Sequence, residues 1–211
     1  MPTYTLNVLI ESEQLKLLKE NCYTLCIARK VHDPLGARYT VVWSGTKDFS
    51  EDNNVFRWTD GYTVYASKKF QVGDLVEAES NKMSIAYKQE CLFDDTGSMQ
   101  QAKADPKPVD GTFKITNKFG AISFGMSSEL NGENHANYIS PVIIKGHVVL
   151  APVDEVRVWF ALNLLTGTMF SDFTGEYIEL QFGGDRTTAT VCYDQTGSWQ
   201  LMGSDPGVVQ G

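Results

Sequence analysis

DDTGSMQ (residues 94–100) and DQTGSWQ (residues 194–200) are identical at five of their seven positions. In each stretch an aspartate, Asp94 or Asp194, stands two residues before the sequence Thr-Gly-Ser. An Asp side chain can accept a hydrogen bond from the backbone two residues later, and glycine adopts a positive φ angle at little cost. We therefore predict that each stretch is the turn of a β-hairpin.

Several segments outside these turns alternate between apolar and polar side chains, which is typical of half-buried β-strands. Examples are residues 4–10 (YTLNVLI) and 22–31 (CYTLCIARKV), and residues 38–45 (RYTVVWSG) are expected to form a further strand. Such segments recur about every 8 to 12 residues with turn signals between them, as in β-sandwiches and barrels. Residues 12–21 (SEQLKLLKEN) have a helical pattern instead, with Ser12 as the expected N-cap. The sequence therefore predicts an all-β protein with one short helix near its N-terminus.

Residues 101–110 (QAKADPKPVD) carry two prolines and alternating charges, and we interpret them as a semi-rigid linker. Two pairs of similar segments occur in the same order on either side of it: YTLCIARK with GTFKITNK, and VFRW with VRVW. We therefore predict two tandem antiparallel β-sandwich domains, residues 1–100 and 111–211, related by a diverged duplication. Independent convergence of turn chemistry is the alternative explanation.

The composition excludes some classes of partner. The chain has 211 residues, a formal net charge of −8, and 11 Phe, 9 Tyr and 4 Trp. An acidic chain is a poor partner for phosphate backbones, so nucleic acid is excluded as the expected partner. For the chain as a whole, the same charge argues against binding anionic lipid through a basic patch. Neutral lipid head groups and glycans remain open.

The cysteines and the N-terminus concern the cellular compartment. Cys22, Cys26, Cys91 and Cys192 have no zinc-binding spacing, and we expect four buried free thiols, which fits a reducing compartment. Residues 1–10 lack the basic region and cleavage site of a signal peptide, and no apolar stretch approaches 18 residues. We expect synthesis as a soluble cytoplasmic protein without a transmembrane segment. Release by lysis or an unconventional route would allow action outside the cell.

Aromatic residues close to acidic and amide residues are the strongest candidates for ligand binding. Exposed rings can stack on the C–H faces of sugars while carboxylates and amides bind the hydroxyl groups, and such rings also suit membrane interfaces. In the first half we select Trp43, Asp60 and Tyr62, beside an acidic loop and an Asp-Gly turn. In the second half we select a predicted loop with three polar residues, Asn134, His135 and Asn137. Trp58 and Trp159 are expected in the core.

No catalytic motif of the HExxH, GxSxG or phosphate-loop type is present, and we assign no catalytic residue, metal ligand or cofactor. The oxygen-rich residues 48–54 (DFSEDNN) leave Ca²⁺ as a minor alternative.

Three functions are compatible with these observations. The first is a non-catalytic binding protein for glycans or lipid head groups, with a cytolytic or defensive role, because many lectins and toxins share this architecture and composition. The second is an enzyme with a pocket in a barrel or between the domains. The third is a self-assembling structural protein, which would form homo-oligomers through its strand edges. Exposed Trp or Tyr rings would favour the first, and a carboxylate with a displaced pKa in a pocket would favour the second.

Overall fold

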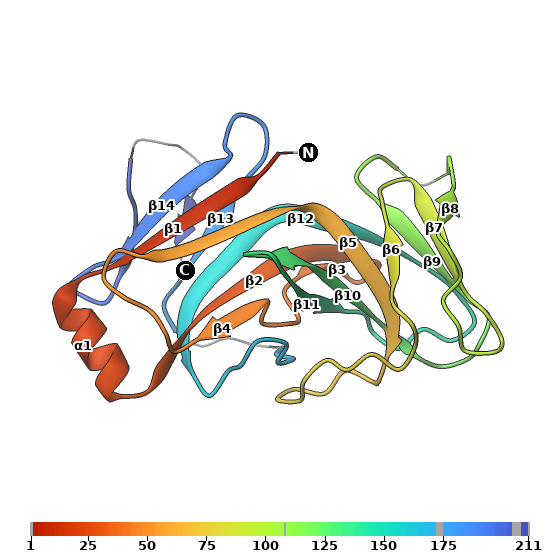
Figure 1. Cartoon of the computed structure of the whole chain (residues 1–211), viewed down its shortest axis with the longest axis horizontal. Coiled ribbons are helices and arrows are strands. Elements are labelled where there is room, and N and C mark those ends of the chain that lie inside the picture. Colours follow the sequence, from red (N-terminus) through yellow and green to blue (C-terminus); the bar gives the residue numbers. More distant parts are fainter. Residues whose placement is uncertain (1, 108, 172–174, 204–207, 211) are drawn as a thin grey trace.

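The computed structural model describes residues 2–107, 109–171, 175–203 and 208–210, the last three by their backbone alone. The described chain is 55% strand and 5% helix, in two sheets with one helix, which confirms the all-β prediction. Figure 1 shows an elongated molecule with α1 (Ser12–Glu20) near one end. At the other end lie β7 (Gln89–Phe93), β8 (Lys103–Ala104) and β9 (Phe113–Asn117).

The first sheet has seven strands in the order β11-β10-β5-β1-β14-β15, with β6 also paired to β5. These strands are β1 (Tyr4–Ile10), β5 (Asn54–Ser67), β6 (Met83–Ile85), β10 (Ser123–Leu130), β11 (Glu133–Ile139), β14 (Thr188–Tyr193) and β15 (Trp199–Leu201). In β1, every second residue is buried, as its alternating sequence predicts.

The second sheet has nine strands. Its main path is β16-β13-β12-β9-β7-β8, and β2 joins it through β12 and also pairs with β3 and β4. The strands not yet introduced are β2 (Tyr23–Asp33), β3 (Gly36–Arg38), β4 (Ser44–Thr46), β12 (Gly146–Leu162), β13 (Tyr177–Gln181) and β16 (Val208–Gln210).

The sequence predicted antiparallel pairing throughout, but two strand pairs are parallel. β1 runs parallel to β14, from Thr5 beside Thr188 to Ile10 beside Tyr193, and β7 runs parallel to β9. The other strand pairs in the described ranges are antiparallel. A parallel pair needs a long connection, and the segment between β1 and β14 contains most of the chain.

Strand pairing crosses the predicted linker. β1 pairs with β14, and β2 pairs with β12 from Leu25 beside Phe160 to His32 beside Ala151. The predicted linker, residues 101–110, itself contains β8, which pairs with β7. Residues 1–100 and 111–211 therefore share their sheets in this structure, which corrects the expectation of one sandwich from each half.

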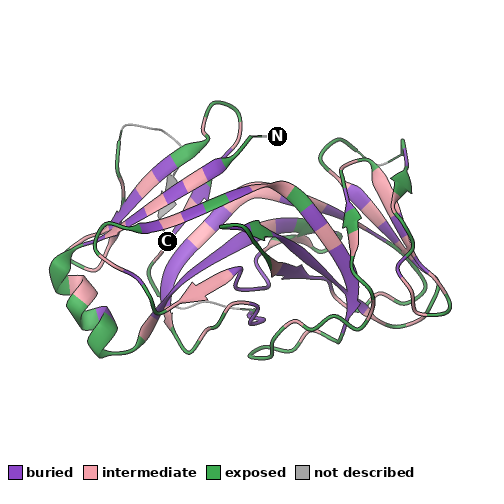
Figure 2. Ribbon diagram, viewed as in Figure 1, coloured by how far each residue is buried: buried purple, intermediate pink, exposed green. Residues whose placement is uncertain are grey.

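The apolar side chains form two main cores. The first core, near α1, includes Leu6, Trp58 and Val158, and the second core, near β7 and β9, includes Val64 and Phe113. β5 and β12 contribute to both cores, and Figure 1 shows these two long strands running along most of the molecule. Figure 2 shows the buried residues gathered on the strands and a largely exposed helix.

The proposed duplication is not confirmed. The similar segments VFRW and VRVW lie on the two long strands, but their tryptophans do not occupy equivalent positions. Trp58 points into the first core, whereas Trp159 belongs to a separate cluster with Phe170, while its neighbour Val158 occupies the first core. Both tryptophans are buried, at 2% and 0% exposed, as predicted.

The two repeated turns have nearly identical hydrogen bonds. Asp94 Oδ1 accepts hydrogen bonds from the Thr96 nitrogen at 3.0 Å, the Thr96 hydroxyl at 2.6 Å and the Ser98 nitrogen at 3.1 Å. The corresponding distances around Asp194 are 2.8, 2.6 and 3.1 Å. The glycines have φ angles of 82° and 77°. Antiparallel pairing flanks each turn, so the predicted hairpin turns are confirmed.

Two local predictions need correction. The N-cap of α1 is Glu11, without a side-chain cap, rather than Ser12. All four cysteines are free, as expected, but Cys22 is exposed, since it follows the helix in a turn with φ 57°. In the described residues, no helix has the length and apolar character needed to cross a lipid bilayer.

Candidate functional site

Three long strands, β2, β5 and β12, contribute side chains to both cores, and each has a charged residue at the point where it passes from the first core to the second. In β2, Ile27 lies in the first core and Val31 in the second, with Arg29 between them on the same face. In β5, Asp60 lies between Trp58 and Tyr62 in the same way. In β12, Asp154 lies between Leu150 and Val156. We call Arg29, Asp60 and Asp154 the junction cluster.

Arg29 holds the cluster together. Its Nη2 donates to Asp60 Oδ1 at 2.8 Å and to Asp154 Oδ1 at 3.0 Å, and its Nε donates to the Val153 carbonyl at 3.4 Å. The Arg29 side chain is 0% exposed, whereas those of Asp60 and Asp154 are 14% and 30% exposed. The carboxylates therefore separate the buried guanidinium from solvent.

The first-half candidates surround this arginine. The Arg29 guanidinium lies 5.8 Å from the Trp43 ring centre and 5.2 Å from that of Tyr62. The Tyr62 hydroxyl donates to Asp60 at 3.0 Å and lies 2.9 Å from the Tyr87 hydroxyl. Trp43 and Tyr62 are only 0% and 4% exposed, so their predicted surface position is wrong. Ligand binding by these residues remains a prediction.

The environment shifts the pKa values of Asp154 and of two tyrosines near the junction cluster, Tyr4 and Tyr62. Burial raises the pKa of Asp154; Arg29 opposes this shift and Asp60 adds to it. Burial, reinforced by Asp154 and Asp60, raises the pKa of Tyr4 to about 12. Burial also raises the pKa of Tyr62, although Arg29 opposes the shift. The phenols are therefore neutral at pH 7, and two carboxylates face one guanidinium.

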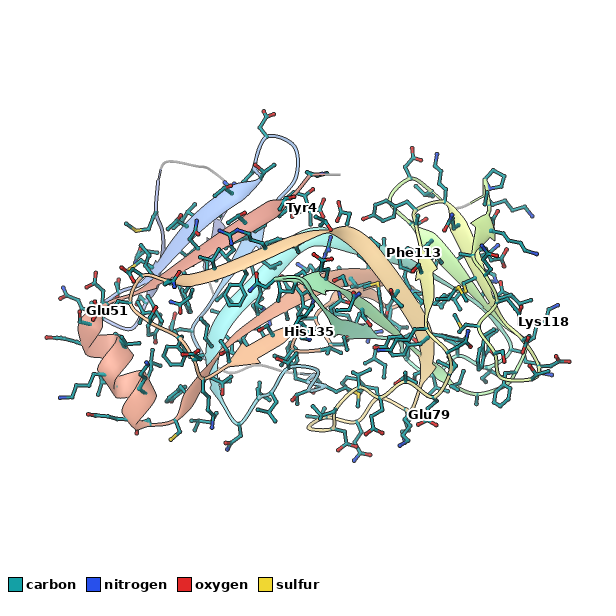
Figure 3. All side chains as sticks on the ribbon, viewed as in Figure 1. Tyr4, Glu51, Glu79, Phe113, Lys118 and His135 are labelled. Carbon is teal, nitrogen blue, oxygen red and sulfur yellow. The ribbon has the colours of Figure 1, made fainter. Side chains whose placement is uncertain are left out.

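The second-half candidates lie on strand β11 rather than in a loop. Asn134 is exposed, and His135 is 3.4 Å from Glu133, in the middle of the molecule in Figure 3. Asn137 is fully buried and donates to the Ser128 hydroxyl at 2.5 Å. The Trp43 indole nitrogen donates to the Ser128 carbonyl at 3.2 Å. Ser128 therefore connects Asn137 to the first set, while Asn134 is exposed and His135 is half-buried.

A groove of about 560 Å³ lies beside α1, at the opposite end from β7 and β9. This volume is in the usual range of small-ligand sites. Half-buried tyrosine rings, two amides, an exposed carboxylate and an exposed leucine line it: Tyr23, Tyr193, Gln14, Asn21, Glu176 and Leu162. The groove therefore combines aromatic and hydrogen-bonding groups, the chemistry predicted for a glycan site, but it uses different residues.

One of the two tyrosines in this groove, Tyr193, packs against two other aromatic rings. The Tyr193 ring centre lies 4.9 Å from that of Trp199 and 5.0 Å from that of Phe160, and Phe160 and Trp199 stack at 11°. Burial, together with Glu176 and Tyr23, raises the pKa of Tyr193. The Gln14 amide nitrogen donates to the Gln195 carbonyl at 3.0 Å, which joins α1 to the second repeated turn. The rim of the groove is therefore preorganised.

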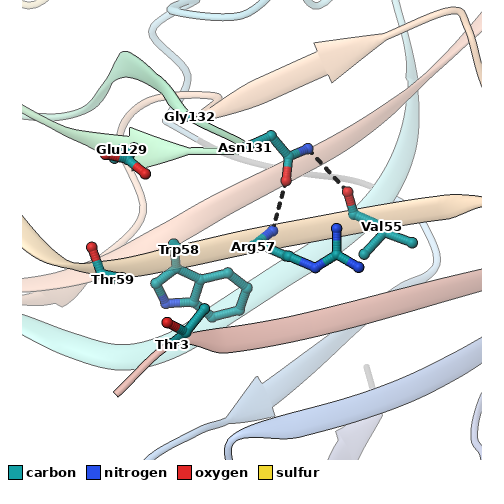
Figure 4. A pocket seen from close by; sticks show the side chains of 8 residues that line it. All are labelled: Thr3, Val55, Arg57, Trp58, Thr59, Glu129, Asn131 and Gly132. Atoms are coloured by element: carbon teal, nitrogen blue, oxygen red, sulfur yellow. Dashed lines mark hydrogen bonds between the residues drawn. The ribbon is translucent and has the colours of Figure 1, made fainter. Parts of the chain in front are cut away.

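A second depression, of about 480 Å³, lies over β5 (Figure 4). Arg57, Glu129 and Asn131 are exposed there, and the Trp58 ring lies beside Thr3, between Thr59 and Arg57 along β5. Asn131 accepts a hydrogen bond from the Arg57 backbone at 2.8 Å and donates to the Val55 carbonyl at 3.0 Å. The Trp58 ring is nearly buried, so this depression offers charge but little aromatic surface.

Within the described ranges, no group of three or more His, Cys, Asp or Glu residues could hold a metal ion. The acidic residues at 48–54 do not form such a group. Instead, Asn54 uses its side chain to accept from the Ser50 nitrogen at 2.8 Å and to donate to the Val8 carbonyl at 2.9 Å.

Comparison with known proteins gives no relative: no family model, curated protein or solved structure matches the chain significantly. The function must therefore be inferred from the geometry.

Sequence reasoning missed Arg29, Asp154, Tyr23 and Tyr193. For Arg29 and Asp154 a signal was present, because each is a single charge that interrupts an apolar alternation on a long strand. No comparable signal marked the tyrosines, which are brought together by the pairing of β2 and β12 and the position of β14.

Proposed function

We propose that the protein is a non-catalytic glycan-binding protein and that its ligand occupies the groove beside α1. The observation that carries this proposal is the combination of two half-buried tyrosine rings with amide and carboxylate groups around one groove. Among the sites described above, this one best combines a hollow of suitable volume with available aromatic surface.

The chemistry of the groove suits a sugar ring. An aromatic face packs against the C–H groups of a sugar while the edge of the ring and nearby polar groups bind its hydroxyls. Tyr193 can provide such a face without a large loss of entropy, because Trp199 and Phe160 already hold its ring. Gln14, Asn21 and Glu176 can bind hydroxyl groups along the rim.

Charge limits the class of glycan. Glu176 is exposed at the groove, and the chain carries a net charge of −8. Like charges placed opposite each other oppose binding. Neutral or amino sugars therefore fit the groove better than sialylated or sulfated glycans.

The test is a screen of immobilised neutral, amino and acidic glycans, followed by calorimetric titration of the best ligand. Glu176→Gln removes the charge with minimal change of shape, and Glu129→Gln is the matched control in the depression of Figure 4. Glutamine can still accept a hydrogen bond, but a neutral hydrogen bond contributes about 0.5–1.5 kcal/mol and one to a charged group about 1.5–3 kcal/mol, so Glu176→Gln should weaken binding about 5- to 10-fold. Glu129→Gln should bind normally.

Tyr193→Phe separates stacking from hydrogen bonding, because it keeps the ring and removes the hydroxyl. A stacked ligand should retain most of its affinity to this variant. Absence of binding to every glycan at millimolar concentration would refute the proposal. Loss of binding in Glu129→Gln alone would move the site to the depression over β5.

One observation supports the enzymatic alternative: the pKa of Asp154 is raised, and a second carboxylate, that of Asp60, shares the Arg29 guanidinium with it. Incubation of the bound glycan with the protein, followed by a reducing-end assay, tests it. Hydrolysis that disappears in Asp154→Asn would favour an enzyme, and an intact glycan would favour the binding protein.

A further inference from the structure

Two neighbouring loops present apolar side chains at the end of the molecule opposite α1. They are residues 118–122 (KFGAI), between β9 and β10, and residues 141–145 (PVIIK), before β12. Phe119, Val142 and Ile144 are 48%, 44% and 72% exposed. Figure 3 shows the labelled Lys118 at this extremity, far from Glu51 near the helix. We call these two loops the apolar tip.

A buried asparagine fixes both loops. Asn117 is 2% exposed, and its amide nitrogen has two hydrogens to share among three carbonyls within hydrogen-bonding distance, those of Gly120 at 2.6 Å, Ile143 at 2.9 Å and Ile144 at 2.7 Å. Its amide oxygen accepts from the Phe119 nitrogen at 3.0 Å. The asparagine therefore holds the backbones that carry the exposed apolar side chains.

Further contacts brace the loops from below. Ile122 and Ile143 exchange backbone hydrogen bonds of 3.1 and 2.7 Å. The ring centre of Phe119 lies 5.3 Å from that of the buried Phe93, and Gly97 of the first repeated turn lies against the Phe119 ring. One side of Phe119 is therefore packed on the protein while the rest faces outward.

The local charge differs from that of the whole chain. The two loops contain Lys118 and Lys145, both exposed, and no acidic residue, whereas the chain has a net charge of −8. Lys68, Lys69 and Glu79 line a hollow together with Phe119 and Val142, and Lys118 lines another hollow together with Glu90 and Asp94. Exposed charges further away than about 8 Å are largely screened at physiological salt, so the two lysines of the loops count for more at the tip than the net charge of the whole chain.

We propose that the apolar tip binds the surface of a phospholipid bilayer. The three apolar side chains enter the boundary between head groups and acyl chains, while Lys118 and Lys145 contact lipid phosphates. Lysine stems suit this boundary, because the chain packs on apolar surface and the ammonium group stays among head groups. Anionic lipids strengthen the contact through the lysines.

A bilayer fits the tip better than a second copy of the chain. Stable protein interfaces bury about 800 Å² on each partner over a surface of 20–30 residues. Here the exposed apolar surface comes from three side chains on two short loops. Such a small projecting surface can enter a fluid bilayer without a complementary partner surface.

The proposal is independent of glycan binding, because the tip and the groove lie at opposite ends of the molecule. Vesicles that contain no glycan therefore test it alone. We would sediment the full chain with vesicles of phosphatidylcholine, and with vesicles in which about a third of the lipid is phosphatidylserine. We expect reversible binding to both kinds of vesicle, and tighter binding to the anionic ones. Binding to the anionic vesicles should be weaker in 0.5 M salt, because salt screens the attraction between the lysines and the lipid charges.

Single substitutions identify the residues that act. Ile144→Ser should weaken binding at least about tenfold, because the isoleucine side chain that enters the bilayer is replaced by a small polar one. Leu35→Ser is the matched control, since Leu35 is 70% exposed in the turn between β2 and β3. Lys118→Gln should reduce the preference for anionic vesicles about fivefold and leave binding to neutral vesicles nearly unchanged.

A fluorescence measurement gives a second readout. The four native tryptophans are buried, so Phe119→Trp adds an indole at an exposed site. Its emission should shift to shorter wavelength with vesicles and be quenched by a lipid-attached quencher, and Leu35→Trp should not respond. The proposal is overturned if the wild type binds neither vesicle, or if Ile144→Ser and Leu35→Ser bind equally. It is also overturned if sedimentation of the protein alone shows a dimer that Ile144→Ser dissociates.

Discussion

Replacement of Arg29 by methionine tests how the two cores are joined. Arg29 is fully buried and binds Asp60 and Asp154 through one nitrogen atom, Nη2. Methionine fills much of the same volume but leaves two carboxylates close together without a positive charge. We therefore expect a loss of stability that comes mainly from charge rather than from packing.

The structure sets the size of this loss. Removal of one partner of a buried ion pair costs about 3–5 kcal/mol. The two aspartate side chains are 14% and 30% exposed, so water can partly solvate them, and we place the loss at about 3 kcal/mol. In a triple variant, Arg29→Met with Asp60→Asn and Asp154→Asn, no unpaired charge remains. Its stability should return to within about 1 kcal/mol of the wild type.

Urea denaturation followed by tryptophan fluorescence measures these changes. Without Arg29 the pKa of Asp154 rises further, and a raised carboxyl pKa lowers stability once the pH exceeds the unfolded value of about 4. The loss in Arg29→Met should therefore be larger at pH 7 than at pH 4. Lys16→Met, which removes an exposed 4.0 Å ion pair with Glu20, is the control and should cost less than about 0.5 kcal/mol. Equal losses at both pH values, without recovery in the triple variant, would refute the electrostatic account.

Three further predictions concern other parts of the fold. Gly125→Ala should lose about 1–3 kcal/mol in the same urea assay, because an added Cβ would lie 2.3 Å from a tyrosine ring, whereas Gly61→Ala, with nothing within 4 Å, should change stability by less than about 0.5 kcal/mol. A thiol reagent should modify only Cys22 in the folded protein and all four cysteines in urea, and rapid native reaction of a second thiol would contradict the described burial. Asp94 and Asp194 have pKa values lowered by hydrogen bonds from the threonine side chains and the turn backbones, so the stability that they supply is complete above pH 4 and is lost as the pH falls through the folded pKa. The double Asn variant should therefore lose less stability than the wild type on acidification from pH 5 to pH 2, and parallel curves would show that these carboxylates do not contribute.

The parts of the fold that were predicted from sequence depend on local interactions. All the hydrogen bonds around Asp94 are made within six residues, so the residue types alone specify the turn. The alternation in β1 and the pattern of α1 are local in the same sense. Such features do not depend on which strands become neighbours.

The pairing of distant strands was not predictable in this way. The alternating pattern of β1 is compatible with any partner, and nothing in it indicates a parallel neighbour more than 180 residues away. The similar segments VFRW and VRVW indicated duplication. However, any two half-buried strands alternate apolar and polar residues and so have similar sequences, and Trp58 and Trp159 in fact lie in different clusters. Similarity of strand sequences was therefore weak evidence for equivalent positions.

The candidate site was predicted in part. Asp60 and Tyr62 were selected for their Asp-Gly turn, and the structure brings them together with Trp43 around Arg29. Their exposure was misjudged, because Asp60 and Gly61 continue strand β5 rather than end it in a turn. The partners of Arg29 lie 31 and 125 residues away in the sequence, beyond the reach of local patterns.

The parallel pairing of β1 with β14 also constrains how the protein is made. On a ribosome, β1 emerges long before its parallel neighbour β14, which begins only at Thr188. At 5–20 residues per second, roughly 10 to 35 s of elongation separate the two strands. During that interval β1 can pair with β5, but its other edge has no partner strand. Slow elongation should therefore increase the dependence of this protein on chaperones, and β1 should be more protease-sensitive in a nascent chain stalled before Thr188 than in one that includes β14.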